Sequence, residues 1–303
     1  MSFRPVKSTS HATPTMEGAG VKLHRAFGFH NPEMFDPYLL FDDFRNEVPA
    51  DYAAGFPWHP HRGIETITYV LSGSVSHTDS LGNEGTLGAG DVQWMTAGSG
   101  IMHQEMPAGN ARGQMHGFQL WANLPASLKM TAPRYQDITG SDIPEIIDDD
   151  GTRVKVIIGS FWGQRSPIDG IAADPQYLDV FVPAGLRKTF KIDTYRQAFA
   201  YIFEGAGRFE EASAPLGVLV EKEVAGAEMN IRDLSGNRVL VQFGTGDEIS
   251  VQAEPEGLRF LLISGAPLQE PVAWHGPIVM NTKEELRVAM QDLRNNTFIK
   301  STH

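Results

Sequence analysis

Short apolar runs alternate with turn-forming residues along most of this chain. Three of the turn signals are Ser72-Gly73, the segment 81–85 and Gly88-Ala89-Gly90-Asp91, which are combinations typical of hairpin ends. Many short strands separated by such turns predict an all-β fold of antiparallel barrels or sandwiches. The strands expected from this pattern include 21–29, 38–44, 92–95 and 115–120.

The pattern changes to a helical one near the end of the chain. Thr282 and Glu285 have the spacing of a capping box, in which each side chain caps a backbone N–H of the other residue. Leu286, Met290 and Leu293 then follow at helical spacing. We expect a C-terminal helix whose apolar stripe docks on its own protein.

Two histidine-containing pairs lie within the predicted strands. Side chains two residues apart in a strand point to the same face, so His59 and His61 form one pair, and His103 and Glu105 form another. If the first strand continues unbroken, the same face also carries the residues at later odd positions. That face would line a barrel interior with Glu65, Ile67, Tyr69 and Leu71.

Three imidazoles and one carboxylate are a suitable ligand set for a divalent transition metal. A single histidine on an apolar strand is usually a satisfied polar residue, but two such pairs in glycine-rich surroundings favour a metal site. The mixed nitrogen and oxygen set suits Fe(II), Mn(II) or Ni(II) better than a sulfur-rich zinc site. Asp42 and Asp43 are interpreted as turn or surface carboxylates, with a supporting role at the metal as the alternative.

The second half of the chain repeats features of the first. The segment 200–205 is similar to 68–73, and Gly246-Asp247 is similar to Gly90-Asp91. We therefore expect a first domain at 1–142, a linker at 143–151 and a second domain at 152–303. With these offsets, the four ligand positions of the first half correspond to Lys191, Asp193, Arg259 and Leu261, so no metal is expected in the second half.

Composition and charge limit the classes of function. The chain has 303 residues, of which 41% are hydrophobic, enough for two packed domains. A formal net charge of −12 argues against direct binding to a nucleic-acid backbone. The absence of cysteine excludes disulfides and thiol catalysis. No signal peptide or membrane segment is predicted, so we expect a cytoplasmic protein, or a nuclear one if the source is eukaryotic.

Four segments carry a resemblance to the pirin family of the cupin superfamily: FDPYLLFDDF, FPWHPHRGIETITYVLSG, GDVQWMTAGSGIMHQEMP and EPVAWHGPIVMNTKEEL. The resemblance spans nearly the whole chain. It implies a bicupin, with two cupin-type antiparallel β-barrels, a C-terminal helix, and one metal, usually iron, in the first barrel. The family's ligands fall on His59, His61, His103 and Glu105. Many other cupins use the glutamate at the position of Glu65, to which the resemblance gives a supporting role. His116 is left open between a supporting role and an ordinary strand histidine.

The resemblance implies two kinds of function. Some pirins are quercetin 2,3-dioxygenases, which open flavonols with O2, whereas others resemble nuclear co-regulators that respond to metal redox state. We favour the dioxygenase, with a flavonol-like substrate, Glu105 or Glu65 as the base, and Fe, or else Mn, Ni, Cu or Zn, as the metal. The alternative is a metal-responsive regulator that acts through protein partners such as transcription factors.

Overall fold

Strands dominate the computed structural model, which describes residues 2–30, 32–168, 172–209, 221–224, 227–230 and 235–300. The chain forms two units, each assembled from segments that are distant in sequence. The unit that contains 13–143, 167–173 and 268–303 is called the histidine unit here. The unit that contains 1–12, 144–166 and 174–267 is called the apolar unit.

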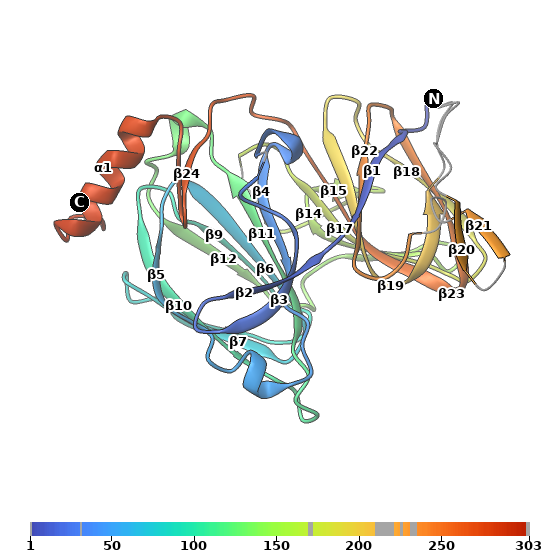
Figure 1. Ribbon diagram of the computed structural model, residues 1–303, viewed down its shortest axis with the longest axis horizontal. Coiled ribbons are helices and arrows are strands. Elements are labelled where there is room, and N and C mark those ends of the chain that lie inside the picture. Colours follow the sequence, from blue (N-terminus) through green and yellow to red (C-terminus); the bar gives the residue numbers. More distant parts are fainter. Residues whose placement is uncertain are drawn as a thin grey trace. The chain divides into compact units, whose positions relative to one another are not determined.

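The histidine unit contains two main antiparallel sheets (Figure 1). In spatial order the larger sheet comprises β12 (Arg134–Ile138), β9 (Val92–Thr96), β6 (Ile64–Ser72), β11 (His116–Asn123), β4 (Tyr38–Asp43), β3 (Val21–Phe27) and β2 (Thr13–Glu17). The smaller sheet comprises β5 (Phe56–His61), β10 (Ile101–Ala108), β7 (Ser74–Asp79) and β8 (Glu84–Leu87). Short 3-10 helices lie at Pro32–Phe35, Pro49–Asp51 and Ala126–Leu128. The all-β class is confirmed, but the sheets are open and do not close into the expected barrels.

The strand expected to run unbroken from His59 to Leu71 is interrupted. β5 ends at His61, β6 begins at Ile64, and the two strands belong to different sheets. Gly63 has a φ of +77°, a conformation that favours glycine, and it turns the chain from one sheet into the other. The alternation of side chains therefore restarts at β6, and the expectation that the odd positions continue the face of the two histidines is wrong.

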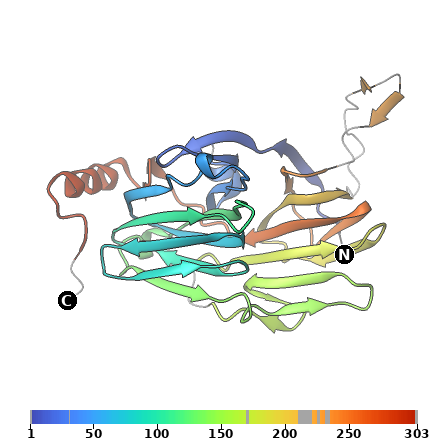
Figure 2. The same cartoon turned by 90° about the horizontal axis from the view of Figure 1, so that it is seen from below.

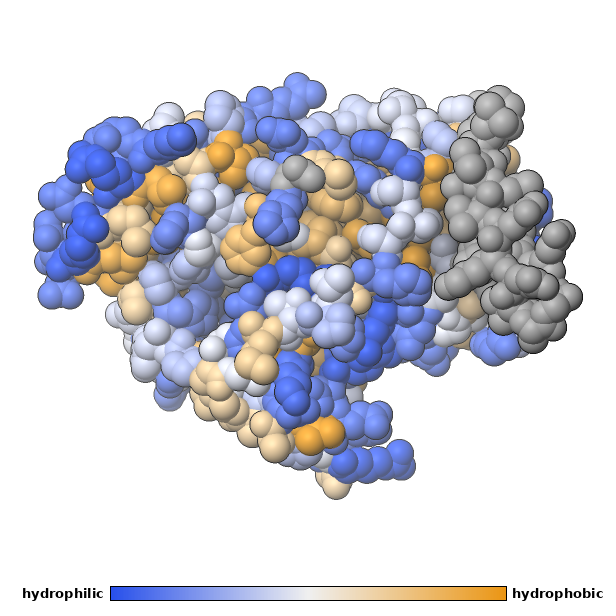
Figure 3. Space-filling model, viewed as in Figure 1, coloured by the Kyte–Doolittle hydropathy of each residue, from blue (hydrophilic) through white to orange (hydrophobic). Residues whose placement is uncertain are grey.

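The C-terminal segment belongs to the histidine unit. It contains β24 (Ala273–His275), β25 (Ile278–Met280) and α1 (Lys283–Arg294), which lies beside the short hairpin (Figure 2). The predicted capping box between Thr282 and Glu285 is confirmed. The stripe packs against a cluster of buried residues as expected, and the outer surface of the helix is hydrophilic (Figure 3). No helix within the described ranges is long and apolar enough to cross a membrane.

One large sheet forms most of the apolar unit. Its path is β1 (Val6–His11), β22 (Val239–Phe243), β19 (Gln197–Phe209), β23 (Glu248–Gly265), β17 (Gln176–Val182), β14 (Arg153–Ile158) and β13 (Glu145–Ile147), with β18 (Arg187–Lys191) also paired to β23. Two small hairpins complete it, formed by β15 (Ser160–Phe161) with β16 (Gln164–Arg165) and by β20 (Glu221–Val224) with β21 (Ala227–Asn230). The segment 143–151, expected as a linker, includes β13, and the first strand of the chain pairs within this unit.

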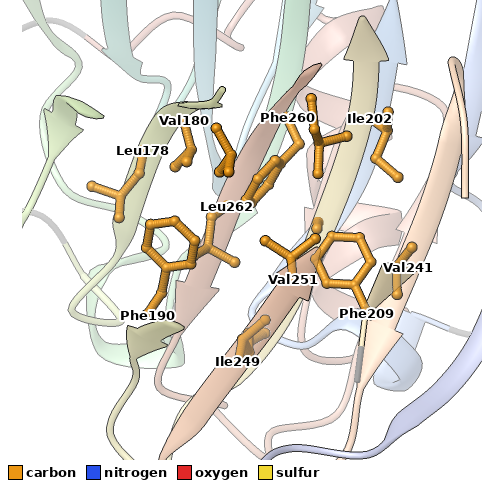
Figure 4. Close-up of a cluster of buried hydrophobic side chains, with 14 of the residues drawn as sticks. Leu178, Val180, Phe190, Ile202, Phe209, Val241, Ile249, Val251, Phe260 and Leu262 are labelled. Carbon is orange, nitrogen blue, oxygen red and sulfur yellow. The ribbon is translucent and has the colours of Figure 1, made fainter. Parts of the chain in front are cut away.

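Hydrophobic side chains fill the interior of the apolar unit. Phe190 on β18, Phe209 on β19, and Phe260 and Leu262 on β23 belong to this cluster of buried side chains (Figure 4). Of the positions that correspond to the ligands, Arg259 is paired with Asp179 at 2.7 Å and Leu261 is buried. The core of this unit is therefore formed by packed apolar side chains.

Candidate metal centre

The three candidate histidine ligands come from two adjacent strands of the smaller sheet. β5 and β10 are antiparallel, and His103 lies directly opposite His59 in their register. β5 is the edge strand, which explains why it tolerates Pro57 and Pro60, since an edge strand needs fewer backbone donors. The strand spacing predicted from the sequence thus brings all three imidazoles to one place.

The three imidazoles form a tight cluster. The potential ligand atoms of His59, His61 and His103 all lie within 4.8 Å of one another. His61 and His103 are almost fully buried, at 2% and 1% exposure, whereas His59 is partly exposed. Within the described ranges, no other group of three His, Asp or Glu side chains converges in this way.

Hydrogen bonds orient two of these rings for coordination. His59 Nδ1 lies 2.9 Å from the carbonyl oxygen of Pro57, and His61 Nδ1 lies 3.2 Å from that of Pro277. A carbonyl oxygen only accepts, so Nδ1 must carry the proton, and Nε2 of each neutral ring presents a lone pair. These two Nε2 atoms face each other at 3.1 Å. Backbone carbonyls that fix the outer ring nitrogen are typical of metal-ligating histidines.

The local electrostatics keep the imidazoles neutral. Burial, together with the neighbouring imidazoles, places the pKa values of His61 and His103 well below the usual range, and burial also lowers the pKa of His59. Both ring nitrogens of His103 lack a hydrogen-bond partner among the described residues. Neutral, converging lone pairs with an unsatisfied buried ring are the arrangement that a divalent cation would stabilise, so the residues fit a metal.

The carboxylate of Glu105 lies near the cluster but is not part of it. A register shift in the β5–β10 pairing falls between His103 and Glu105, so Glu105 is opposite Phe56. Its side chain is hydrogen-bonded with Thr68, and burial raises its pKa to about 7. The structure therefore brings the three predicted histidines together, and places the predicted fourth ligand on the same strand without joining it to the group of three.

Glu65 occupies a different face. It lies on β6, and because side chains alternate along a strand, it points to the side opposite that of Thr68. Its Oε1 accepts a 2.7 Å hydrogen bond from the Thr96 hydroxyl, and burial raises its pKa. Glu65 does not line the pocket beside the imidazoles. The break at Gly63 causes this placement, which sequence periodicity alone does not reveal.

The interpretation of Asp42 and Asp43 as turn or surface carboxylates is wrong. Both lie in β4 and are buried, at 5% and 0% exposure. Asp42 accepts two hydrogen bonds of 2.8 Å from Arg25, and burial raises its pKa to about 6. Asp43 lies 3.9 Å from Nε2 of His116, and His116 does not line the pocket.

A pocket of about 540 Å³ opens beside the imidazoles, and all the residues that line it belong to the histidine unit. His59, His61 and Glu105 contribute to its wall, whereas His103 is buried and does not. Its volume is in the usual range for small-molecule sites. The apolar part of the lining includes Val21, Leu23, Phe44, Tyr52, Phe56, Trp58, Val75, Met115 and Trp121.

Two parts of the site were missed by sequence reasoning. The ring of Trp121 stands edge-on to that of His61, with centroids 5.0 Å apart. The C-terminal segment supplies Gly276 and Pro277 to the wall, far along the chain from the histidines. The tail motif EPVAWHGPIVM contains these two residues, but nothing in its local pattern indicates which strand it reaches.

The C-terminal segment also holds the turn between β5 and β6. Val279 donates its backbone N–H to the carbonyl of Arg62 at 3.0 Å. The Lys129 ammonium donates to the carbonyl oxygens of Gly63 at 2.8 Å and Val279 at 3.0 Å. The Arg62 guanidinium is buried, and it donates to Asp292 at 2.8 Å from a position over the Phe298 ring. The strand that carries His59 and His61 is thus fixed at its end by the C-terminal segment that begins at Leu268.

Two β-sheet units, one with a histidine cluster beside a pocket and one with a hydrophobic interior, define a two-domain cupin-type protein. Comparison with known proteins supports the same two-domain architecture. The pirin family model matches residues 20–122, and the model of the pirin C-terminal cupin domain matches residues 177–299. The chain therefore belongs to the pirin family.

Individual relatives cover the whole length. A pirin-like protein of Caulobacter vibrioides is 43% identical over 98% of this chain and 100% of its own. A Pseudomonas aeruginosa protein, which carries the provisional name of a quercetin 2,3-dioxygenase, is 40% identical over 97% of both chains. The crystal structure of quercetin 2,3-dioxygenase from Acinetobacter baumannii superposes with a TM-score of 0.83 at 29% identity, covering 98% of this chain and 99% of the other.

Proposed function

We propose that this pirin is a metal-dependent dioxygenase that opens flavonols such as quercetin with O2. The observation that carries the proposal is the convergence of three neutral imidazoles at the edge of a largely apolar pocket of about 540 Å³. The names of the Pseudomonas and Acinetobacter relatives support the same reaction class. The partners are then a planar aromatic substrate and O2.

His59, His61 and His103 would hold the metal, with Glu105 as the fourth protein ligand. The family resemblance favours iron, and Mn, Ni, Cu or Zn are the alternatives that this nitrogen and oxygen set permits. When bound, the metal supplies Lewis acidity, which lowers the pKa of a coordinated hydroxyl group and orients it.

The chain's own residues account for the rest of the chemistry. Glu105 lines the pocket, so its carboxylate is placed to accept the proton of a substrate hydroxyl, as a ligand that can loosen from the metal. Trp121, Phe44 and Phe56 exclude water from the space beside the imidazoles. The carbonyls of Pro57 and Pro277 keep the His59 and His61 rings in the coordinating tautomer.

O2 uptake by metal-loaded protein with a panel of flavonols tests the proposal. We expect uptake with at least one flavonol, and a loss of roughly 10² in rate for Glu105→Gln, since general-base catalysis typically contributes that much. Metal content measured on the same samples separates a lost base from a lost ligand. No uptake with any flavonol, together with an affinity for a protein partner that follows metal oxidation state, would favour the regulatory alternative.

A further inference from the structure

A row of polar side chains crosses the larger sheet of the histidine unit at a single register. Arg25 on β3 is paired with Asp42 on β4, Asp42 with Gln119 on β11, and Gln119 with Thr68 on β6. Residues directly opposite each other in antiparallel strands share a face, so all four side chains point the same way. All four line the pocket beside the imidazoles.

The neighbouring rows on this face are mostly apolar. Two residues away along the strands, Leu40 and Trp121 lie on one side of the polar row, and Phe44 and Val70 lie on the other. Leu40, Trp121 and Phe44 also line the pocket. A planar ligand in this pocket would therefore have apolar groups against its faces and polar groups along one line.

The side chains of the polar row satisfy only part of their hydrogen-bonding capacity among themselves. Arg25 and Asp42 form a two-pronged ion pair with both distances at 2.8 Å, and the Thr68 hydroxyl donates to Oε1 of Gln119 at 2.7 Å. The amide nitrogen of Gln119 has no hydrogen-bond partner among the described residues, although its side chain lines the pocket. Asp42 keeps lone pairs beyond those used by Arg25, because each carboxylate oxygen can accept more than one hydrogen bond.

Stability alone does not explain such a row. An ion pair in a buried sheet gives no advantage over apolar side chains of similar volume, because desolvation offsets the Coulomb attraction. The amide N–H₂ of Gln119, which has no protein acceptor among the described residues, remains able to donate to a molecule in the pocket. Both features fit a surface whose partner is a ligand.

The polar row begins beside the histidine cluster and runs away from it. Thr68, at one end, lines the pocket together with Glu105, which lies two residues from His103 on β10. Arg25, at the other end, lies over the ring of Phe29, which is 42% exposed. Three inter-strand spacings separate these ends, or roughly 14 Å at about 4.8 Å each. The row thus leads from the histidine cluster toward the surface over about the length of a three-ring aromatic molecule.

We propose that Gln119 and Asp42 are specificity-determining residues that bind hydroxyl groups on the substrate ring farthest from the imidazoles. This inference rests on the proposed function and narrows its substrate class to planar aromatics that carry hydroxyls on that outer ring. The Gln119 amide donates to one hydroxyl oxygen, and the Asp42 carboxylate accepts from a neighbouring hydroxyl. In a flavonol the ring concerned is the phenyl substituent.

The test compares quercetin with galangin, which differ only in the two hydroxyls of the phenyl ring. Both are titrated anaerobically into metal-loaded protein, and quenching of tryptophan fluorescence is followed, since Trp58 and Trp121 line the pocket. We expect quercetin to bind about tenfold more tightly, as two net hydrogen bonds typically allow. In Gln119→Met, of similar shape but without donors, only the Asp42 hydrogen bond remains, so the preference should fall to about threefold, with galangin affinity unchanged.

Gln136→Met is the matched control, because Gln136 lies on the same sheet and does not line the pocket. It should keep the full preference. If Gln119→Met fails to fold, quercetin methylated at both phenyl hydroxyls, titrated into wild type, gives the same information, and an undiminished affinity would overturn the proposal. An undiminished preference of about tenfold in Gln119→Met, while O2 uptake persists, overturns the specificity role and leaves the dioxygenase intact. If wild type binds neither flavonol and consumes no O2, both proposals fall.

Discussion

The substitution Gly63→Ala tests how the C-terminal segment controls the metal-bearing strand. Gly63 has a φ of +77°, and a Cβ atom there would lie 1.9 Å from the carbonyl oxygen of Val279 on β25. No side-chain rotation relieves this contact, because both atoms are fixed by the backbone. β25 would have to move away from the β5–β6 turn.

The size of the effect follows from three contributions. The left-handed conformation costs an alanine roughly 1–2 kcal/mol. Displacing β25 breaks the hydrogen bond from Val279 N–H to the Arg62 carbonyl and disturbs those from Lys129 to Gly63 and Val279. At about 1 kcal/mol each, these bring the loss in unfolding free energy to roughly 4–5 kcal/mol.

Gly82→Ala is a matched control. Gly82 also has a positive φ, +86°, but a Cβ atom there would have no neighbour within 4 Å. It should lose only the conformational cost of roughly 1–2 kcal/mol. Urea unfolding followed by tryptophan fluorescence reports the difference, since Trp58, Trp94, Trp121 and Trp274 all lie in the histidine unit.

Metal affinity provides a second measurement on the same variants. Moving β25 also shifts Pro277, whose carbonyl orients His61, so Gly63→Ala should bind metal about tenfold more weakly than wild type. Gly82→Ala should bind it normally. Several kcal/mol are expected from the contact, so a stability difference of less than about 1 kcal/mol between the two variants would contradict this role of Val279. Wild-type metal affinity in both variants would also show that β25 does not hold the metal-bearing strand in place.

Three further predictions concern the site and its support. His61→Ala should lose the metal while His275→Ala, an exposed histidine outside the cluster, keeps it; equal metal content by elemental analysis would contradict the assignment. Glu65→Gln should keep its metal and most of its turnover, because Glu65 faces away from the pocket; a tenfold loss of rate with full metal content would restore its role as a base. Burial lowers the pKa of Lys129 from 10.5 to about 7, so the unfolded chain binds one more proton between these values. Stability should therefore rise with pH across this window, by up to about 1.4 kcal/mol per unit, and urea unfolding at pH 7.5 and 9 should show a flatter dependence in Lys129→Met.

The sequence by itself determined the features that depend on local spacing. Alternation and turn residues predicted the all-β class and several strands, and the period of two brought His59 and His61 to one face. The capping box at Thr282 fixed the start of α1, because both of its partners lie within one turn of helix. Each of these features is set by residues a few positions apart, for which the backbone allows few arrangements.

Only the tertiary structure decided what depends on long-range pairing. The break at Gly63 moved Glu65 to the face opposite the pocket, and the approach of Val279 from a distant segment leaves no room for a Cβ atom at this turn. Asp42 is buried because β11 and β3 enclose β4, and Pro277 reaches His61 because the C-terminal hairpin returns to the histidine unit. Local periodicity sets which side chains share a face, but the strands that cover that face come from anywhere in the chain, and their packing energy selects the pairing.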